Sequence, residues 1–200
     1  MARLSFSKAS LHKESKKLKL FRQYLPSLDL KRQQLMVERA KVLAQLQETE
    51  RKIEQCQQTI ADSLPMLANK NFVLDGLVKV VRITKGEENI VGISIPTLVD
   101  VEIHCTPYST YTKPHWVDQM VIQLKTMLEL RLQLQINRKR VEILELAVKK
   151  VTQKVNLFDK VLIPKSIENI RKIRIFLSDA ERADVVRAKI TKQNRLQKGL

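Results

Sequence analysis

Glycine, aromatic residues and cysteine are scarce in this chain of 200 residues. It has four glycines and 4% aromatic residues, too few for the turns and deep core of a compact fold with many elements. The two cysteines, Cys56 and Cys105, lie far apart in the sequence, so a reduced, cytoplasmic protein is expected. No apolar run approaches the ~18 residues that span a bilayer, and the N-terminus lacks the apolar core of a signal peptide. We therefore expect no direct membrane insertion.

Aliphatic residues at helical spacing are plentiful instead. A first long helix is predicted from about residue 10 to about residue 68, because this segment has no glycine and its apolar positions step by three, four or seven. Pro65 is expected to end or kink it. The predicted seam positions of this helix are Leu35, Val42, Leu46, Ile53 and Ile60.

A second long helix is predicted from about residue 114 to about residue 195. Apolar residues recur every seven positions over about six heptads, which is typical of a coiled coil. Asn137 interrupts the stripe, and a buried polar residue of this kind often fixes the register of a coiled coil. The predicted seam positions are Leu134, Val141, Leu144, Val148, Val151, Val155, Phe158 and Leu162.

The segment between the helices, about 72–105, has a different pattern. β-Branched runs flank the polar stretch 85–89 (KGEEN), which predicts a β-hairpin with its turn there. A third β-rich run, 98–104, is a candidate for joining it. Two interpretations of this region stay open: a cap on the turn of the coil, or a contact surface for a partner. Its apolar residues outnumber what one hairpin buries: Leu77, Val78, Val80, Val81, Ile90, Val91, Ile93 and Ile95.

These elements predict one mainly α-helical, elongated domain spanning residues 1–200. The two long helices fold back on each other as an antiparallel coiled coil, since each stripe is the nearest cover for the other, and the β-hairpin element lies at the turn. Facing residue numbers then sum to about 183, at 1.5 Å of rise per residue. In this register Pro26 and Pro164 fall within about two turns of the same level, and a kink is expected near Pro164.

Positive charge is concentrated at the two ends of the sequence. Residues 1–32 carry nine Lys and Arg against two acids, and residues 165–200 carry ten against four, so these segments hold +13 of the net charge of +16. Antiparallel pairing brings both to one tip, which is predicted to bind an acidic partner. The cations assigned to this basic tip are Lys13, Lys16, Lys17, Arg171, Lys172, Arg174, Arg182 and Arg187.

Other functions were weighed against this interpretation. A basic coiled-coil protein that binds RNA or another nucleic acid is the alternative, because clustered Lys and Arg also neutralise phosphates. Few aromatic residues lie in the basic segments, so stacking on single strands would be poor. His104 and Cys105 have no further ligand at metal-binding spacing, and no phosphate-binding loop occurs, so no metal, cofactor or catalytic residue is expected. A structural linker outside any motor is a third hypothesis.

The C-terminal segment also resembles a known family. The residues that carry the resemblance are 155–164 (VNLFDKVLIP), Ile167, Ile170, Arg171, Ile173, Arg174, Leu177, 179–182 (DAER), 187–189 (RAK) and, near the N-terminus, 30–35 (LKRQQL). Together they closely resemble the signature of the D subunit of the V-type and archaeal-type rotary ATPases, in a member of prokaryotic length. Order and spacing agree over nearly the whole chain.

The resemblance implies a central rotor shaft that binds no nucleotide itself. Its termini would enter the ring of catalytic and regulatory subunits (A and B), and the basic tip would contact that ring. Its stalk would bind the small F subunit. Its far end would couple to the membrane ring through a funnel-shaped protein, the C subunit of prokaryotes or the d subunit of eukaryotes. Such a shaft is cytoplasmic, peripherally associated with the membrane through the complex, and is not expected to bind nucleic acid.

Overall fold

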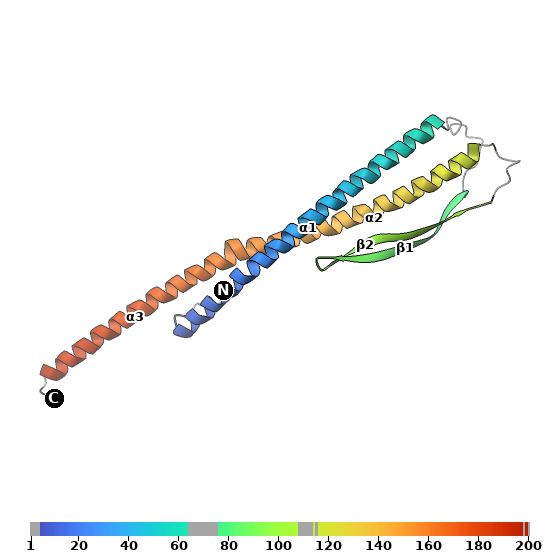
Figure 1. Cartoon of the computed structure of the whole chain (residues 1–200). Coiled ribbons are helices and arrows are strands. Elements are labelled where there is room, and N and C mark those ends of the chain that lie inside the picture. The colour runs from blue at the N-terminus through green and yellow to red at the C-terminus, as the bar shows by residue number, and fades with distance from the viewer. Residues whose placement is uncertain (1–4, 64–75, 108–113, 115, 198, 200) are drawn as a thin grey trace. The chain divides into compact units, whose positions relative to one another are not determined.

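A computed structural model gives the architecture (Figure 1) and describes residues 5–63, 76–107, 114, 116–197 and 199. Within these residues the element order is α1 (Lys8–Ser63), β1 (Val78–Ile90), β2 (Ile93–Cys105), α2 (Trp116–Leu157), the π-helical turn η2 (Phe158–Leu162) and α3 (Ile163–Gln197). The predicted fold class, long helices with a β-hairpin between them, is confirmed. The expected effect of Pro65 and the expected helix end near residue 68 lie outside the described residues.

The chain divides into two compact units. One, here called the basic unit, comprises Met1–Arg32 and Lys150–Leu200; the other, the hairpin unit, is Gln33–Lys149. The basic unit contains 22 Lys and Arg against 7 Asp and Glu, a net charge of +15, whereas the hairpin unit has 15 against 14, or +1. The two units therefore differ in net charge as well as being packed separately.

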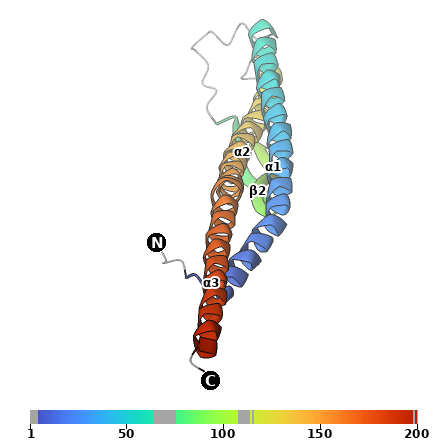
Figure 2. The same ribbon diagram turned by 90° about the vertical axis from the view of Figure 1, so that its left-hand side faces the viewer.

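In the hairpin unit, α1 and α2 run antiparallel, side by side in the views of Figures 1 and 2. Ion pairs join Arg39 to Glu145 at 3.1 Å and Glu50 to Arg138 at 3.2 Å, so residue numbers rise along α1 as they fall along α2. These pairs agree with the predicted register. Every predicted seam position in this unit is buried or half-buried, and Leu144 is fully enclosed.

A polar pair interrupts the apolar seam of this unit. Asn137 and Thr49 are 4% and 5% exposed, and the Asn137 amide donates to Thr49 Oγ1 at 3.4 Å. Thr49 in turn donates its hydroxyl proton to the Gln45 carbonyl at 2.7 Å. Because a shift of one helix along the other would leave the buried Asn137 amide without this partner, the pair favours one register.

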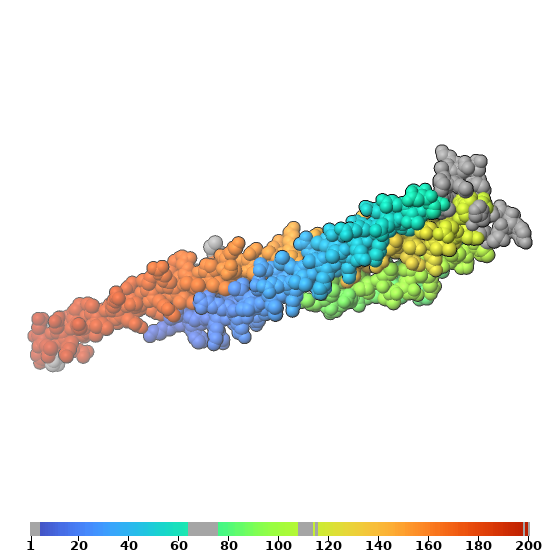
Figure 3. All heavy atoms as spheres, turned by 45° about the horizontal axis from the view of Figure 1, so that its top comes forward, coloured from blue at the N-terminus to red at the C-terminus, as the bar shows by residue number. Residues whose placement is uncertain are grey.

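The β-hairpin packs on the helices of its own unit through its base and near its tip. At the base, Leu77 belongs to a buried cluster with Trp116 and Val117 of α2, against which Ile60 of α1 also packs. Towards the tip, Glu88 lies 3.5 Å from Arg140 of α2. Figure 3 shows the hairpin (green) lying against α2 (yellow). The opposite face exposes apolar side chains, with Val81 and Val99 each 66% accessible.

The predicted position of the hairpin turn was wrong. β1 continues through the stretch 85–89, and the turn is the pair Val91 and Gly92, with φ of 54° and 78°. Gly86 is needed for another reason: a Cβ there would lie 2.7 Å from a Val99 methyl and 2.9 Å from the Thr97 hydroxyl. The run 98–104 is likewise no third strand but part of β2, paired with β1.

In the basic unit, the helix changes its hydrogen bonding just before Pro164. Over η2 the turn widens, and the Ile163 N–H reaches the Phe158 carbonyl. Pro164 has no N–H for the carbonyl four residues earlier and its ring crowds that carbonyl, which a wider π turn relieves. Phe158 packs edge-on against Phe21 of α1 at 5.4 Å between ring centroids.

By contrast, α1 remains helical through Pro26. Every predicted seam position in this unit is also buried or half-buried.

Truncation of the enclosed seam residue Leu144 tests the coil of the hairpin unit. Leu144→Ala is expected to lower the free energy of unfolding by about 2–5 kcal/mol, because it leaves a cavity in a packed seam. Leu146, two residues further on, is 53% exposed, so Leu146→Ala should cost only about 0.5 kcal/mol. Urea unfolding of the two variants checks this. Equal losses would show that Leu144 is not part of a tightly packed seam.

The hairpin turn generates a second prediction. Val91 is β-branched and adopts a positive φ that asparagine tolerates far better. Val91→Asn should therefore stabilise the hairpin by about 1 kcal/mol and slow amide exchange in β1 about fivefold. Native-state hydrogen exchange measures this, with Gly92→Ala as the variant expected to speed exchange. Unchanged exchange in Val91→Asn would mean that the turn carries no such strain.

Candidate partner-binding surface

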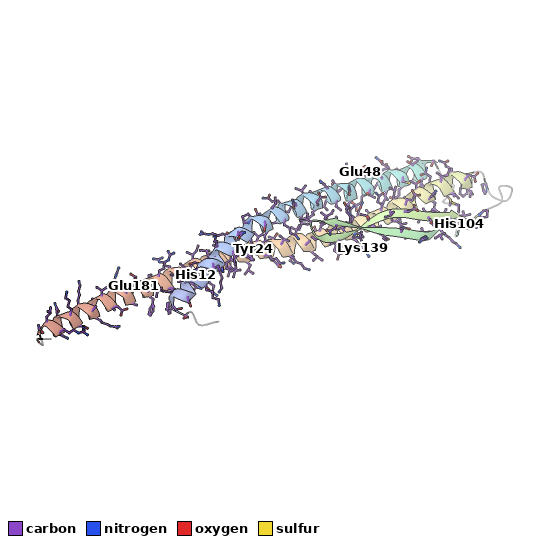
Figure 4. All side chains as sticks on the ribbon, turned by 60° about the horizontal axis from the view of Figure 1, so that its bottom comes forward. His12, Tyr24, Glu48, His104, Lys139 and Glu181 are labelled. Atoms are coloured by element: carbon purple, nitrogen blue, oxygen red, sulfur yellow. The ribbon has the colours of Figure 1, made fainter. Side chains whose placement is uncertain are left out.

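The tip of the basic unit is formed by the start of α1 and by α3. They run antiparallel, since Phe6 stacks near Phe176 with ring centroids 5.0 Å apart and the Asn169 amide donates to Glu14 Oε2 at 3.4 Å. Ile170 and Ile173 of α3 are buried in this pairing. The labelled His12 and Glu181 show the same two helices contributing side chains to the tip (Figure 4).

All eight cations assigned to the basic tip lie on these two helices, but their environments differ. Four have a carboxylate partner on their own helix: Lys17 with Glu14 at 2.7 Å, Lys172 with Glu168 at 2.6 Å, Arg182 with Asp179 at 3.9 Å and Arg187 with Asp184 at 3.3 Å. The other four, Lys13, Lys16, Arg171 and Arg174, are exposed and take part in no ion pair within the described part of the chain. The structure therefore separates cations with a carboxylate neighbour on their own helix from cations that have none among the described residues.

Two of the available arginines line a groove between α1 and α3, here called the arginine groove. It encloses about 690 Å³. Its walls combine guanidinium groups with aliphatic side chains, and no acidic residue lines it. The lining residues are Ser15, Leu18 and Arg22 from α1, and Ile167, Ile170, Arg171, Arg174 and Ile175 from α3.

A second groove of about 490 Å³ continues from the first, because both share Ser15 and Arg174. It is lined further by Lys8, His12 and Glu181, of which Lys8 and Glu181 lie 3.5 Å apart. Lys8 and Glu181 thus offset each other, and Arg174 is the cation that this groove shares with the first. The arginine groove has three arginines and no carboxylate in its lining.

Sequence reasoning missed Arg22 as a site residue. Its spacing gives part of the signal, because Ser15, Leu18 and Arg22 share one face of α1 and Ile167, Arg171 and Arg174 share one face of α3. Which of these faces meet depends on how each helix is rotated about its axis. That rotation is set by packing over the whole unit.

The part of the chain that the structure describes contains no group of three or more His, Cys, Asp or Glu side chains arranged to hold a metal ion. Its helices also include none long and apolar enough to cross a membrane.

Glu14 of α1 is a largely buried carboxylate that accepts a hydrogen bond from Asn169 of α3. The pKa of Glu14 lies below its ordinary value of 4.5, mainly because Lys17 donates a hydrogen bond to the carboxylate. Burial of the side chain raises the pKa, and the hydrogen bond from Asn169 lowers it. A lowered folded-state pKa stabilises the fold above pH 4.5, and this contribution is lost as the pH falls through that lowered pKa.

Glu14→Gln is therefore expected to cost about 1 kcal/mol of unfolding free energy at pH 7, and less as the pH falls below 4.5. Urea unfolding of both proteins at pH 7 and in the acid range measures the difference. Glu181→Gln serves as the control, because the exposed pair with Lys8 should contribute only about 0–1 kcal/mol. A pH-independent difference for Glu14→Gln would contradict the role given to its charge.

Comparison with known proteins supports one family over nearly the whole chain. Residues 10–193 match the family model for the D subunit of ATP synthase. The V-type ATP synthase D subunit of Borreliella burgdorferi is 32% identical, over 99% of this chain and 98% of its own. The proteins of the same name from Chlamydia felis and Chlamydia pneumoniae are each 29% identical, over 96% and 95% of this chain and 93% and 92% of their own. The chain belongs to the family of V-type ATP synthase D subunits.

Proposed function

We propose that this chain is the central-stalk rotor subunit of a V/A-type ATPase. In this role it transmits torque between the catalytic ring, where ATP is hydrolysed or made, and the ring that moves ions across the membrane. It is not itself catalytic. Membership of the D-subunit family supports its place in a V-type ATPase complex.

The observation that carries the proposal is the charge division between the units. A net +15 on the basic unit against +1 on the hairpin unit gives the two units different surfaces for partners. The basic unit would contact the ring of A and B subunits. The remaining contacts, with the F subunit on the stalk and with the C or d subunit towards the membrane, would place the protein in the cytoplasm at the membrane surface.

A coiled coil is mechanically suited to this role. Apolar side chains packed along an antiparallel pair resist bending and twisting of one helix against the other. The buried pair of Asn137 and Thr49 would also resist sliding, since a slip would leave the buried Asn137 amide without its Thr49 partner. Both properties favour transmission of torque over its loss in deformation.

Nucleic-acid binding is the alternative that the same charge would allow. No aromatic residue lines either groove of the tip, so the cations there have no ring beside them on which a base could stack. Tagged pull-downs from lysate with and without nuclease treatment separate the two. Recovery of ATPase subunits in fixed ratio under both conditions supports the rotor. Recovery of ribosomal or nucleic-acid-binding proteins only without nuclease supports the alternative.

Neutralising cations of the basic tip is expected to impair coupling. In the assembled ATPase, Arg171, Lys172 and Arg174 are changed together to Gln, which weakens contact with the ring while leaving the coil intact. We expect the coupling ratio, the number of ions moved per ATP hydrolysed, to fall about threefold or more because charges are lost from the interface with the ring. Proton or sodium uptake measured together with ATP hydrolysis gives this ratio.

The control replaces three exposed cations of the hairpin unit, Lys125, Arg131 and Lys139, with Gln. This variant loses the same charge and should keep its coupling ratio. Equal effects in the two variants would argue against a specialised tip.

A further inference from the structure

We propose that the arginine groove binds an acidic segment of a ring subunit, one that presents carboxylates beside an aliphatic side chain. This inference rests on the proposed rotor function and deepens it. The tip would then hold a defined piece of its partner in a shaped site. A smooth charged surface would instead attract acidic loops without preference.

The arginine groove is positively charged. Arg22, Arg171 and Arg174 line the groove, and none of them belongs to an ion pair in the described ranges. Neighbouring cations such as Lys172 and Arg182 are already engaged by carboxylates of their own helix. Three unmatched guanidinium groups around one groove are complementary to carboxylates, which arginine binds through two parallel hydrogen bonds.

The lining between these arginines is apolar. Ile170 is buried beneath the groove, whereas Ile167 and Ile175 remain 43% and 54% exposed. Leu18 adds a half-buried aliphatic wall from α1. Exposed aliphatic side chains ringed by charged groups are typical of a protein-binding site, because an apolar anchor fills the centre and the rim supplies polar contacts.

This combination favours a polypeptide over a nucleic acid. No aromatic residue lines either groove, so no base could stack there. A phosphate backbone would match the charge but leave the isoleucines uncovered. An acidic segment with an aliphatic anchor matches both.

The two grooves together also suggest how the segment lies. Its carboxylates would occupy the arginine groove, because the second groove already contains the paired Lys8 and Glu181. Arg174 is common to both grooves and would mark the boundary between the acidic and the more neutral part of the segment.

The test uses the full chain and the ring of catalytic and regulatory subunits purified without it, with binding rates followed in real time. The groove variant carries Arg22→Gln, Arg171→Gln and Arg174→Gln. The matched control carries Lys150→Gln, Lys154→Gln and Lys160→Gln, which removes the same charge from exposed cations of the same unit that line neither groove. A third variant, with Ile167→Ser and Ile175→Ser, leaves every charge in place. Circular dichroism verifies that each variant remains helical.

We expect the groove variant to dissociate from the ring about tenfold faster or more, since it loses contacts that are desolvated on binding. The control should mainly associate more slowly at low salt, with a dissociation rate within about twofold of the original. The serine variant should also dissociate faster, by about fivefold, because the apolar anchor is lost.

Other outcomes would overturn the inference. Equal dissociation rates in the groove variant and its control would mean that only net charge matters. An unchanged dissociation rate in the serine variant would show that the exposed isoleucines do not contribute to binding. Failure of the original chain to bind the ring, or binding that nuclease abolishes, would instead contradict the proposed rotor function, so the two failures are distinguishable.

Discussion

Burial of one helical stripe against another is the interaction on which the rest of this molecule depends. With few aromatic residues and glycines, the chain has little material for a deep core, and most of its apolar surface lies along two long helices. Pairing these stripes fixes which residues face one another in each unit. Cross-helix contacts such as Glu14 with Asn169 and Thr49 with Asn137 follow from that register.

The same pairing decides which charges are available. Spacing of three or four along a helix lets Lys17, Lys172 and Arg187 find carboxylates locally. Arg171 and Arg174 lie on the face of α3 that turns towards Arg22 of α1, where no carboxylate lines the groove. The basic unit, with a net charge of +15, thus places three arginines that form no ion pair with the described residues beside exposed isoleucines, and we propose that this combination binds its partner.

Much of the fold could be predicted because heptad spacing is a local signal that survives tertiary packing. The two long helices, their antiparallel register and the buried Asn137 all follow from it. The hairpin turn was misplaced because Gly86 suggests a turn, whereas its lack of a side chain makes room for Val99 of the opposite strand. The arginine groove could not be predicted. The sequence shows which residues share a helix face, but it does not show how each helix is rotated about its axis, and that rotation decides which two faces meet.

The proposal that this chain is a rotor can be tested by observing its rotation. Cys105 is exposed and free, and Cys56 can be changed to Ser, which leaves a single attachment point for a probe on the hairpin unit. In a complex whose ring is immobilised, the account predicts that the probe rotates in one direction and in steps when ATP is added. A probe that stays still while the same complexes hydrolyse ATP would contradict the claim that this chain is the rotor.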